Sequence, residues 1–162
     1  MKKLLLILGM VLLTGNVYAA VSTNKAVTIQ TPNIAVVQFL QGTDVAGTYK
    51  TLYTGGANGS KIVSLVANTN DPSAAHLVTC QIKTGGVSYG GTAVNVPVNS
   101  GFATGVPSVN LMSGANWTGL PVDSDGNPFI YLPSSSYTLV CTFATALTST
   151  DVLNVQAVVG DF

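Results

Sequence analysis

Hydrophobic and polar residues alternate with a period of two over much of the chain, which is the pattern of β-strands that bury one face. In residues 76–83, for example, Val78, Cys80 and Ile82 lie on one side of an extended chain, opposite polar Thr79. The alternation predicts strands over residues 34–40, 60–68, 76–83, 93–98, 129–132, 137–145 and 152–159, with a further short strand over 109–112.

Clusters of Gly, Asn, Asp and Pro separate these segments and predict turns, two of them at the glycine pairs 85–86 and 90–91. The chain contains no Arg and no Glu, which favour helices, and is rich in Val, Thr, Gly, Asn and Ser. Many short strands divided by turns are typical of two packed sheets. We therefore expect an all-β fold, a single antiparallel β-sandwich or jelly-roll-like domain.

The N-terminus has the three parts of a secretion signal. Lys2 and Lys3 precede an apolar run over residues 4–13, and Val17 and Ala19 follow at the two positions that a signal peptidase recognises. Ten residues of helix rise only about 15 Å, roughly half of a hydrocarbon core, so the run is too short for a transmembrane helix. We predict a signal peptide over residues 1–19, cleaved after Ala19. The mature protein is then exported to the periplasm, the cell surface or the medium, with no membrane span.

Residues 20–162 have the length of one domain and carry little charge. Six lysines, of which two precede residue 20, leave four against six aspartates, so the net charge is −2. Without Arg or a basic cluster the domain cannot neutralise a phosphate backbone, and we expect no nucleic-acid partner. The weakly charged surface instead predicts contacts with other proteins, in a homo-oligomer or a larger assembly.

Residues 20–40 offer one route to such an assembly. They contain two apolar, strand-like segments joined at Thr31 and Pro32. A segment of this kind adds to the open sheet edge of a neighbouring subunit, or it pairs within its own subunit.

Cys80 and Cys141 both lie on the apolar side of a predicted strand. In an exported protein two inward thiols predict a buried disulfide, worth roughly 4 kcal/mol in the chain-entropy model for a loop of about sixty residues. The spacing resembles the inter-sheet bridge of immunoglobulin domains, although Tyr137 and Trp117 are not at the positions that fold requires. A copper or zinc site that joins both cysteines to His76 is the alternative, and it lacks a fourth ligand.

Residues 99–128 form the longest stretch without a firm strand, and long loops are often functional. The stretch contains the only Trp, Trp117, followed by Leu120. An indole in such a loop folds onto the core as part of a lid, anchors a protein interface, or stacks on a sugar. We take Trp117, Leu120 and Tyr131 as the candidate interface or ligand contacts, with a glycan as the candidate ligand.

The segment around Asp123, Asp125 and Asn127 superficially resembles a calcium loop, because oxygen ligands alternate along it. The position of Gly126 excludes an EF-hand, and a turn that opens the next strand explains the segment as well. It remains a weak calcium candidate. His76 is the only histidine and no nucleophile motif or metal-binding His pair is present, so we expect no enzymatic activity and no cofactor.

Three segments together resemble a group of small tailed-phage and prophage virion-associated proteins. They are Tyr-Thr-Gly-Gly-Ala-Asn-Gly-Ser-Lys-Ile over 53–62, Gly-Leu-Pro-Val-Asp-Ser-Asp-Gly-Asn-Pro over 119–128, and Gly-Asp-Phe over 160–162, and the similarity extends from about residue 47 to 162. The resemblance implies a β-structured subunit that packs against copies of itself or a larger assembly, with no known cofactor or chemistry. The combined expectation is an exported, non-enzymatic structural or surface-assembly subunit of a phage-virion-like β type. The alternative is a secreted carbohydrate- or ligand-binding β-sandwich module.

Overall fold

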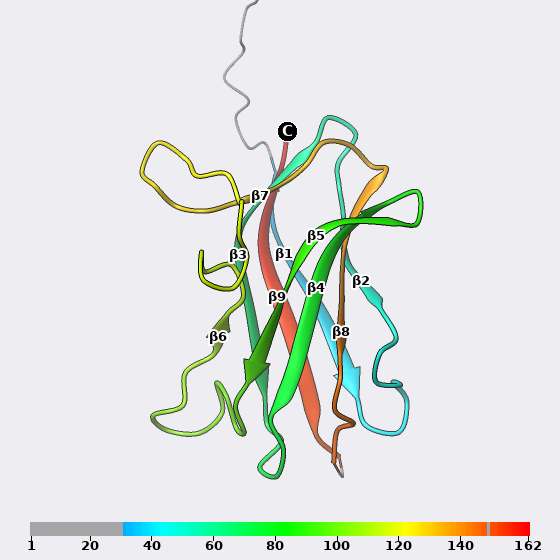
Figure 1. Cartoon of the computed structure of the whole chain (residues 1–162), viewed down its shortest axis with the longest axis vertical. Helices are drawn as coiled ribbons and strands as arrows, with labels where there is room; N and C mark the ends of the chain where they lie inside the picture. The colour runs from blue at the N-terminus through cyan, green and yellow to red at the C-terminus, as the bar shows by residue number, and fades with distance from the viewer. Residues whose placement is uncertain (1–30, 149) are drawn as a thin grey trace, which may run out of the picture.

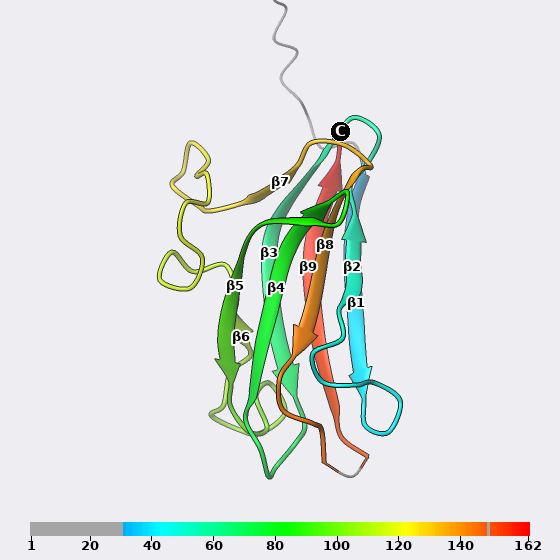
Figure 2. The same ribbon diagram turned by 45° about the vertical axis from the view of Figure 1, so that its right-hand side comes forward.

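The computed structural model describes residues 31–148 and 150–162, which form two antiparallel sheets packed face to face (Figures 1 and 2). Sheet A has five strands in the order β1-β9-β3-β6, and β7 pairs with the same edge of β3 as β6. Sheet B has four strands in the order β2-β8-β4-β5. The strands are β1 (Thr31–Leu40), β2 (Lys50–Thr54), β3 (Ser60–Thr69), β4 (His76–Thr84), β5 (Val87–Val96), β6 (Val109–Asn110), β7 (Ile130–Leu132), β8 (Tyr137–Phe143) and β9 (Val152–Asp161).

The expected all-β sandwich is confirmed, and each predicted strand overlaps an observed one. The predicted signal peptide and residues 20–30 lie outside the described residues. Of the N-terminal segment, Thr31–Leu40 is strand β1 and pairs over its whole length with β9 of its own subunit. The described part of the chain contains no helix that is long and apolar enough to cross a membrane.

One local prediction was wrong, and one strand was missed. The glycine pair 90–91 was predicted as a turn but lies inside β5, which begins at Val87. A Cβ on Gly91 would lie 2.4 Å from the backbone oxygen of Cys80, so glycine is needed there for close approach of two strands and not for a turn. Strand β2 was not predicted, because Leu52 is its single buried residue and a strand with one inward side chain leaves no alternation to detect.

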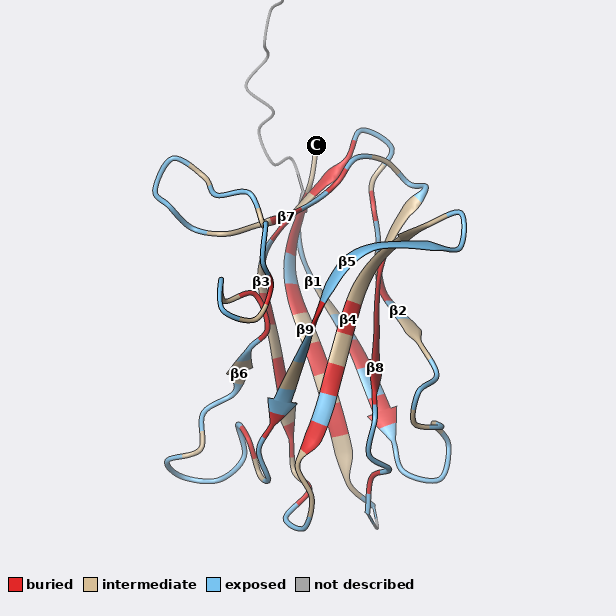
Figure 3. Cartoon of the chain, in the orientation of Figure 1, coloured by how far each residue is buried: buried red, intermediate tan, exposed pale blue. Residues whose placement is uncertain are grey.

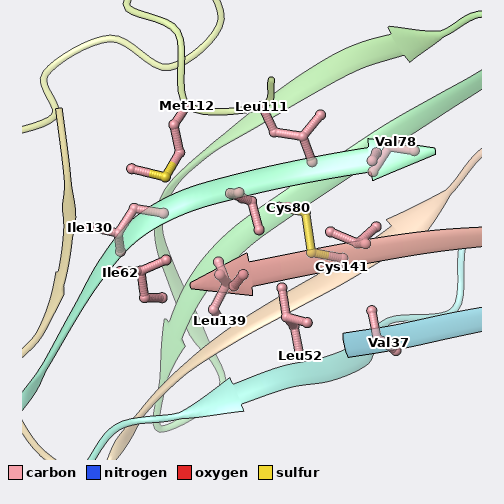
Figure 4. Packing of buried hydrophobic residues seen from close by; sticks show 14 of the residues in the cluster. Val37, Leu52, Ile62, Val78, Cys80, Leu111, Met112, Ile130, Leu139 and Cys141 are labelled. Carbon is pink, nitrogen blue, oxygen red and sulfur yellow. A yellow bond between two sulfur atoms is a disulfide. The ribbon is translucent and has the colours of Figure 1, made fainter. Parts of the chain in front are cut away.

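Inward side chains of both sheets form one core. The alternation of buried and exposed residues is visible along β4 in Figure 3. Side chains from β1, β2, β3, β4 and β8 meet in this core (Figure 4). Cys80 and Cys141 are directly opposite each other on β4 and β8 and form the predicted disulfide. The bridge therefore links neighbouring strands of sheet B, unlike the inter-sheet bridge of immunoglobulin domains.

Candidate functional site

Trp117 lies in the core and not on the surface. Its side chain is 4% exposed and belongs to the same cluster as the sandwich interior. The neighbouring Asn116 holds the loop in place, because its carbonyl accepts a hydrogen bond from Thr92 Oγ1 on β5 (2.8 Å) and its Nδ2 donates to the carbonyl of Asn110 on β6 (3.3 Å). The loop thus closes the side of the sandwich between β5 and β6, as expected of a lid. In this arrangement the indole has no exposed face on which a sugar could stack.

The other two candidate contacts of the loop region differ in exposure. Leu120 is half-buried and packs against the core cluster. Tyr131 is 44% exposed and its ring lies 6.1 Å from the ring of Phe162. Tyr131 is therefore the member of the predicted set that a partner reaches most easily, and its role as an interface residue stays a prediction.

Two of the three segments that resemble virion proteins meet at Asp161. Tyr53 Oη and Ser60 Oγ both donate to Asp161 Oδ1, at 2.7 and 2.5 Å. Burial, and then the hydrogen bond to Asp161, raise the pKa of Tyr53. Gly56 approaches so closely that a Cβ there would lie 3.0 Å from the Asp161 carboxylate. The glycine-rich motif and the terminal Gly-Asp-Phe are therefore two halves of one hydrogen-bonded unit at the end of the sandwich where the C-terminus lies (Figure 1).

The third segment, residues 119–128, is linked to the same end of the sandwich through Lys61. Lys61 Nζ lies 3.6 Å from Asp123 Oδ2 and 4.5 Å from the centroid of the Phe129 ring. The other carboxylate oxygen of Asp123 accepts the backbone N–H groups of Asp125 (3.1 Å) and Asn127 (2.9 Å). The hydrogen bond from the Asn127 N–H is the largest factor that lowers the pKa of Asp123. These contacts are those of a turn that opens a strand.

The calcium candidate gains no further ligands from the fold. Asp123 and Asn127 line a hollow of about 290 Å³, but Asp125 does not line it. Within the described residues no three His, Cys, Asp or Glu side chains gather closely enough to hold a metal ion. A calcium ion here would compete with Lys61 and with two backbone N–H groups for Asp123.

Sequence patterns did not predict a buried, hydrogen-bonded pair of Asp71 and His76, both 0% exposed. His76 Nε2 lies 3.0 Å from Asp71 Oδ2, and Nδ1 lies 2.9 Å from the carbonyl of Thr145. Both ring nitrogens therefore have a polar partner, and the imidazole is held between two loops. Burial alone would raise the pKa of Asp71, but hydrogen bonds from Ser73, Ala74 and Thr148 outweigh it and lower the pKa to about 2.

This pair has a structural and not a catalytic geometry. Both side chains are fully buried, and their partners belong to the loops that connect β3 to β4 and β8 to β9. The two cysteines are joined to each other, so the alternative copper or zinc site with His76 has no thiolate ligand in this structure. In the sequence, Asp71 and His76 are only five residues apart. That separation does not show that a turn brings the two side chains into contact.

The outer face of sheet A carries few charged residues. No residue of β1, of β9 before Asp161, or of β3 after Lys61 is charged. Near the end of this face that contains Leu40 and Val152, a row of amides runs over three strands, with hydrogen bonds of 3.0 Å from Gln38 to Asn154 and from Asn154 to Asn68. Exposed apolar side chains lie on the same face: Ile34, Val36, Leu40, Val63 and Val158. A face with polar groups paired among themselves and apolar groups exposed favours contact with another surface.

No protein-family model and no curated protein matches the chain. Among solved structures, a chain of the cyanophage Pam1 capsid asymmetric unit is similar, with a TM-score of 0.44 and 11% sequence identity over 82% of this chain and 84% of that one. A similarity this weak assigns no role to the chain.

Proposed function

We propose that the chain is an exported, non-enzymatic structural subunit that assembles through the outer surface of its sandwich. The outer face of sheet A carries this proposal. Its amides bond one another in the Gln38–Asn154–Asn68 row, and Ile34, Val36 and Val158 are exposed on the same face, where the charged residues of the three strands, Lys61 and Asp161, lie at one end. Such a surface is weakly hydrated, and burying it against protein is favourable.

Two observations support export. Residues 1–19 contain the charged, apolar and small-residue parts of a secretion signal. The Cys80–Cys141 disulfide, buried in the core, is of a kind that persists in oxidising compartments and is rare in the cytosol.

The phage-virion-like type is the finer part of the proposal. It is supported by the resemblance of segments 53–62, 119–128 and 160–162, which the Asp161 and Lys61 contacts bring to one end of the sandwich. These contacts hold the loops at this end of the sandwich in fixed positions, as a subunit that packs against neighbours requires.

The test is to express the full chain in a bacterial host, fractionate the cells and purify the processed protein without reductant. Intact mass is expected to give a chain that begins at residue 20 with both cysteines oxidised. Light scattering over about a hundredfold range of concentration is expected to give a mass that rises above the monomer. A strict monomer over that range contradicts an assembly role, and retention of an unprocessed chain in the cytosol contradicts export.

A further inference from the structure

Among residues 31–148 and 150–162, side chains of the subunit itself bond the free edge of β1 only over the C-terminal half of the strand. Near the C-terminal end of the strand, Lys50 Nζ donates to the carbonyl of Gln38 (2.9 Å) and the N–H of Leu40 donates to Asp44 Oδ2 (2.7 Å). Lys50 and Asp44 are themselves paired at 2.7 Å. A charged pair of this kind protects a sheet edge from other strands.

The same contacts identify which backbone groups remain open. Gln38 and Leu40 direct their backbone groups away from β9, so the even-numbered residues of β1 face the free edge and the odd-numbered ones face β9. Pro32, Ile34 and Val36 are therefore the residues whose free-edge groups lie beyond the Lys50–Asp44 cover. Pro32 contributes only a carbonyl, because it has no N–H.

The two most exposed apolar side chains of sheet A, Ile34 and Val36, lie at this open part. Ile34 is 66% and Val36 is 55% exposed, and Val158, which is opposite Ile34 on β9, is 41% exposed. Pro32, Asn33, Ile34 and Val158 line a shallow hollow of about 490 Å³. An open strand edge, an apolar row and a hollow thus coincide within five residues, none of them charged.

We propose that this edge pairs with the same edge of a second copy of the chain, antiparallel and around a twofold axis through Ile34. The inference deepens the assembly function proposed above and rests on it. Directly opposite residues of antiparallel strands share a face, so an axis through a residue keeps outward side chains next to outward side chains. An axis through Ile34 uses the open groups: each Ile34 bonds its counterpart through N–H and C=O, and each Val36 N–H meets the partner's Pro32 carbonyl.

The resulting side-chain contacts are self-complementary. The row of Val158 and Ile34 continues into Ile34 and Val158 of the second copy, which gives four apolar side chains in line across the joined sheets. No like charges meet, because the charged Lys50–Asp44 pair lies at the other end of the edge. A charged partner would find no counter-charge between Pro32 and Val37, whereas a second copy supplies an uncharged edge of matching length.

The size of the contact sets the expected affinity. Five paired residues span about 17 Å of strand, so the interface falls below the roughly 1,200 Å² of standard stable complexes. The dimer is therefore weak and depends on protein concentration, and it joins two five-stranded sheets into one.

The test combines a charge variant with a cross-link in the processed full chain. Ile34→Lys places two ammonium groups opposite each other on the axis, and the association constant measured by light scattering or sedimentation is expected to fall at least about tenfold. Ile34→Cys is expected to give a covalent dimer on a non-reducing gel, because opposite residues of a hydrogen-bonded pair have Cα atoms about 5.5 Å apart, within disulfide range. Val87, which is 55% exposed on β5, provides the matched controls Val87→Lys and Val87→Cys, both expected to behave as the parent apart from the added thiol.

Each outcome decides between the two proposals. If the parent protein associates but Ile34→Lys associates equally well and Ile34→Cys does not cross-link, the β1 interface is wrong and the assembly function stands. If Ile34→Lys abolishes association but Ile34→Cys gives no dimer, another segment, such as residues 20–30 of a neighbouring copy, occupies the edge and β1–β1 pairing is overturned. If the parent protein is a strict monomer and Ile34→Cys does not cross-link, both proposals fail.

Discussion

The buried carboxylate of Asp71 is expected to be the most sensitive charged position in the domain. Asp71→Ala removes the acceptor for His76 Nε2, for the N–H groups of Ser73 and Ala74, and for both the N–H and the hydroxyl of Thr148. Water reaches the exposed Ser73 and Thr148 and replaces part of what they lose, but it does not reach His76. A buried donor left without an acceptor costs about 1–3 kcal/mol and hydrogen bonds to a charged acceptor are the stronger ones, so losing the whole Asp71 network costs about 3–5 kcal/mol.

That cost is a large part of the roughly 5–15 kcal/mol that stabilises a domain. We expect the free energy of unfolding of Asp71→Ala to fall by about 3–5 kcal/mol and its Tm to fall by roughly 10 °C or more. The assay is chemical and thermal unfolding followed by the fluorescence of Trp117, the only Trp, which is buried in the folded state. Asp125→Ala is the matched control, because that exposed aspartate lies in a turn, and it is expected to change stability by less than about 0.5 kcal/mol.

The lowered pKa gives a second, independent measurement on the same group. Because the pKa of Asp71 is about 2 in the folded protein and 3.8 ordinarily, its contribution to stability is fully present above pH 3.8 and is lost as the pH falls toward 2. Asp71→Asn keeps the side-chain shape and an acceptor for Ser73 and Ala74, but it does not titrate. The stability difference between the parent and Asp71→Asn should therefore shrink from pH 5 to pH 2. A loss below about 1 kcal/mol for Asp71→Ala, or a difference independent of pH in this range, would refute the reasoning.

Three further predictions concern the core. Replacing Cys80 and Cys141 together by Ala should lower the free energy of unfolding by about 4 kcal/mol for their separation of 61 residues, and the same loss should appear in the parent protein under reductant. Trp117→Ala should cost about 3–5 kcal/mol in denaturant unfolding followed by circular dichroism, and a cost near zero would mean that the loop does not close the core. Gly91→Ala should be strongly destabilising in thermal unfolding because its Cβ would clash with the Cys80 carbonyl, whereas Gly114→Ala, with nothing within 4 Å, should be neutral, and equal effects would contradict the close approach of β4 and β5.

The alternation of side chains predicted most of the fold because each strand buries one face against a single core. It placed β1, β3, β4, β8 and β9 and showed that Cys80 and Cys141 point inward. It could not show that the two cysteines face each other across neighbouring strands, because the pairing of β4 with β8 depends on the order of strands in sheet B. For the same reason it gave no sign that β2 lies beside β8.

The candidate site was harder to predict, because the positions and burial of its residues depend on contacts between segments that are distant in the sequence. Trp117 attracted attention as a lone aromatic residue in a loop, but its burial follows from the hydrogen bonds that tie Asn116 to β5 and β6. Ser60 and Asp161 belong to two of the segments that resemble virion proteins, but nothing in the sequence pairs them, and the register of β3 against β9 makes them partners. Burial of the indole moves the candidate site away from the loop and onto the strands.

The chain covers the two sides of the sandwich differently, and this difference explains why assembly is expected at β1 and not at the Trp117 loop. Between β5 and β6 the chain closes the gap itself, because the loop around Trp117 fills the core and its neighbour Asn116 bonds both edges. On the opposite side, Lys50 and Asp44 cover the β1 edge only near Gln38 and Leu40. The uncovered part carries exposed Ile34 in place of a protective charge. A domain that shields one half of an edge strand and leaves the other half apolar favours one pairing partner over indiscriminate association.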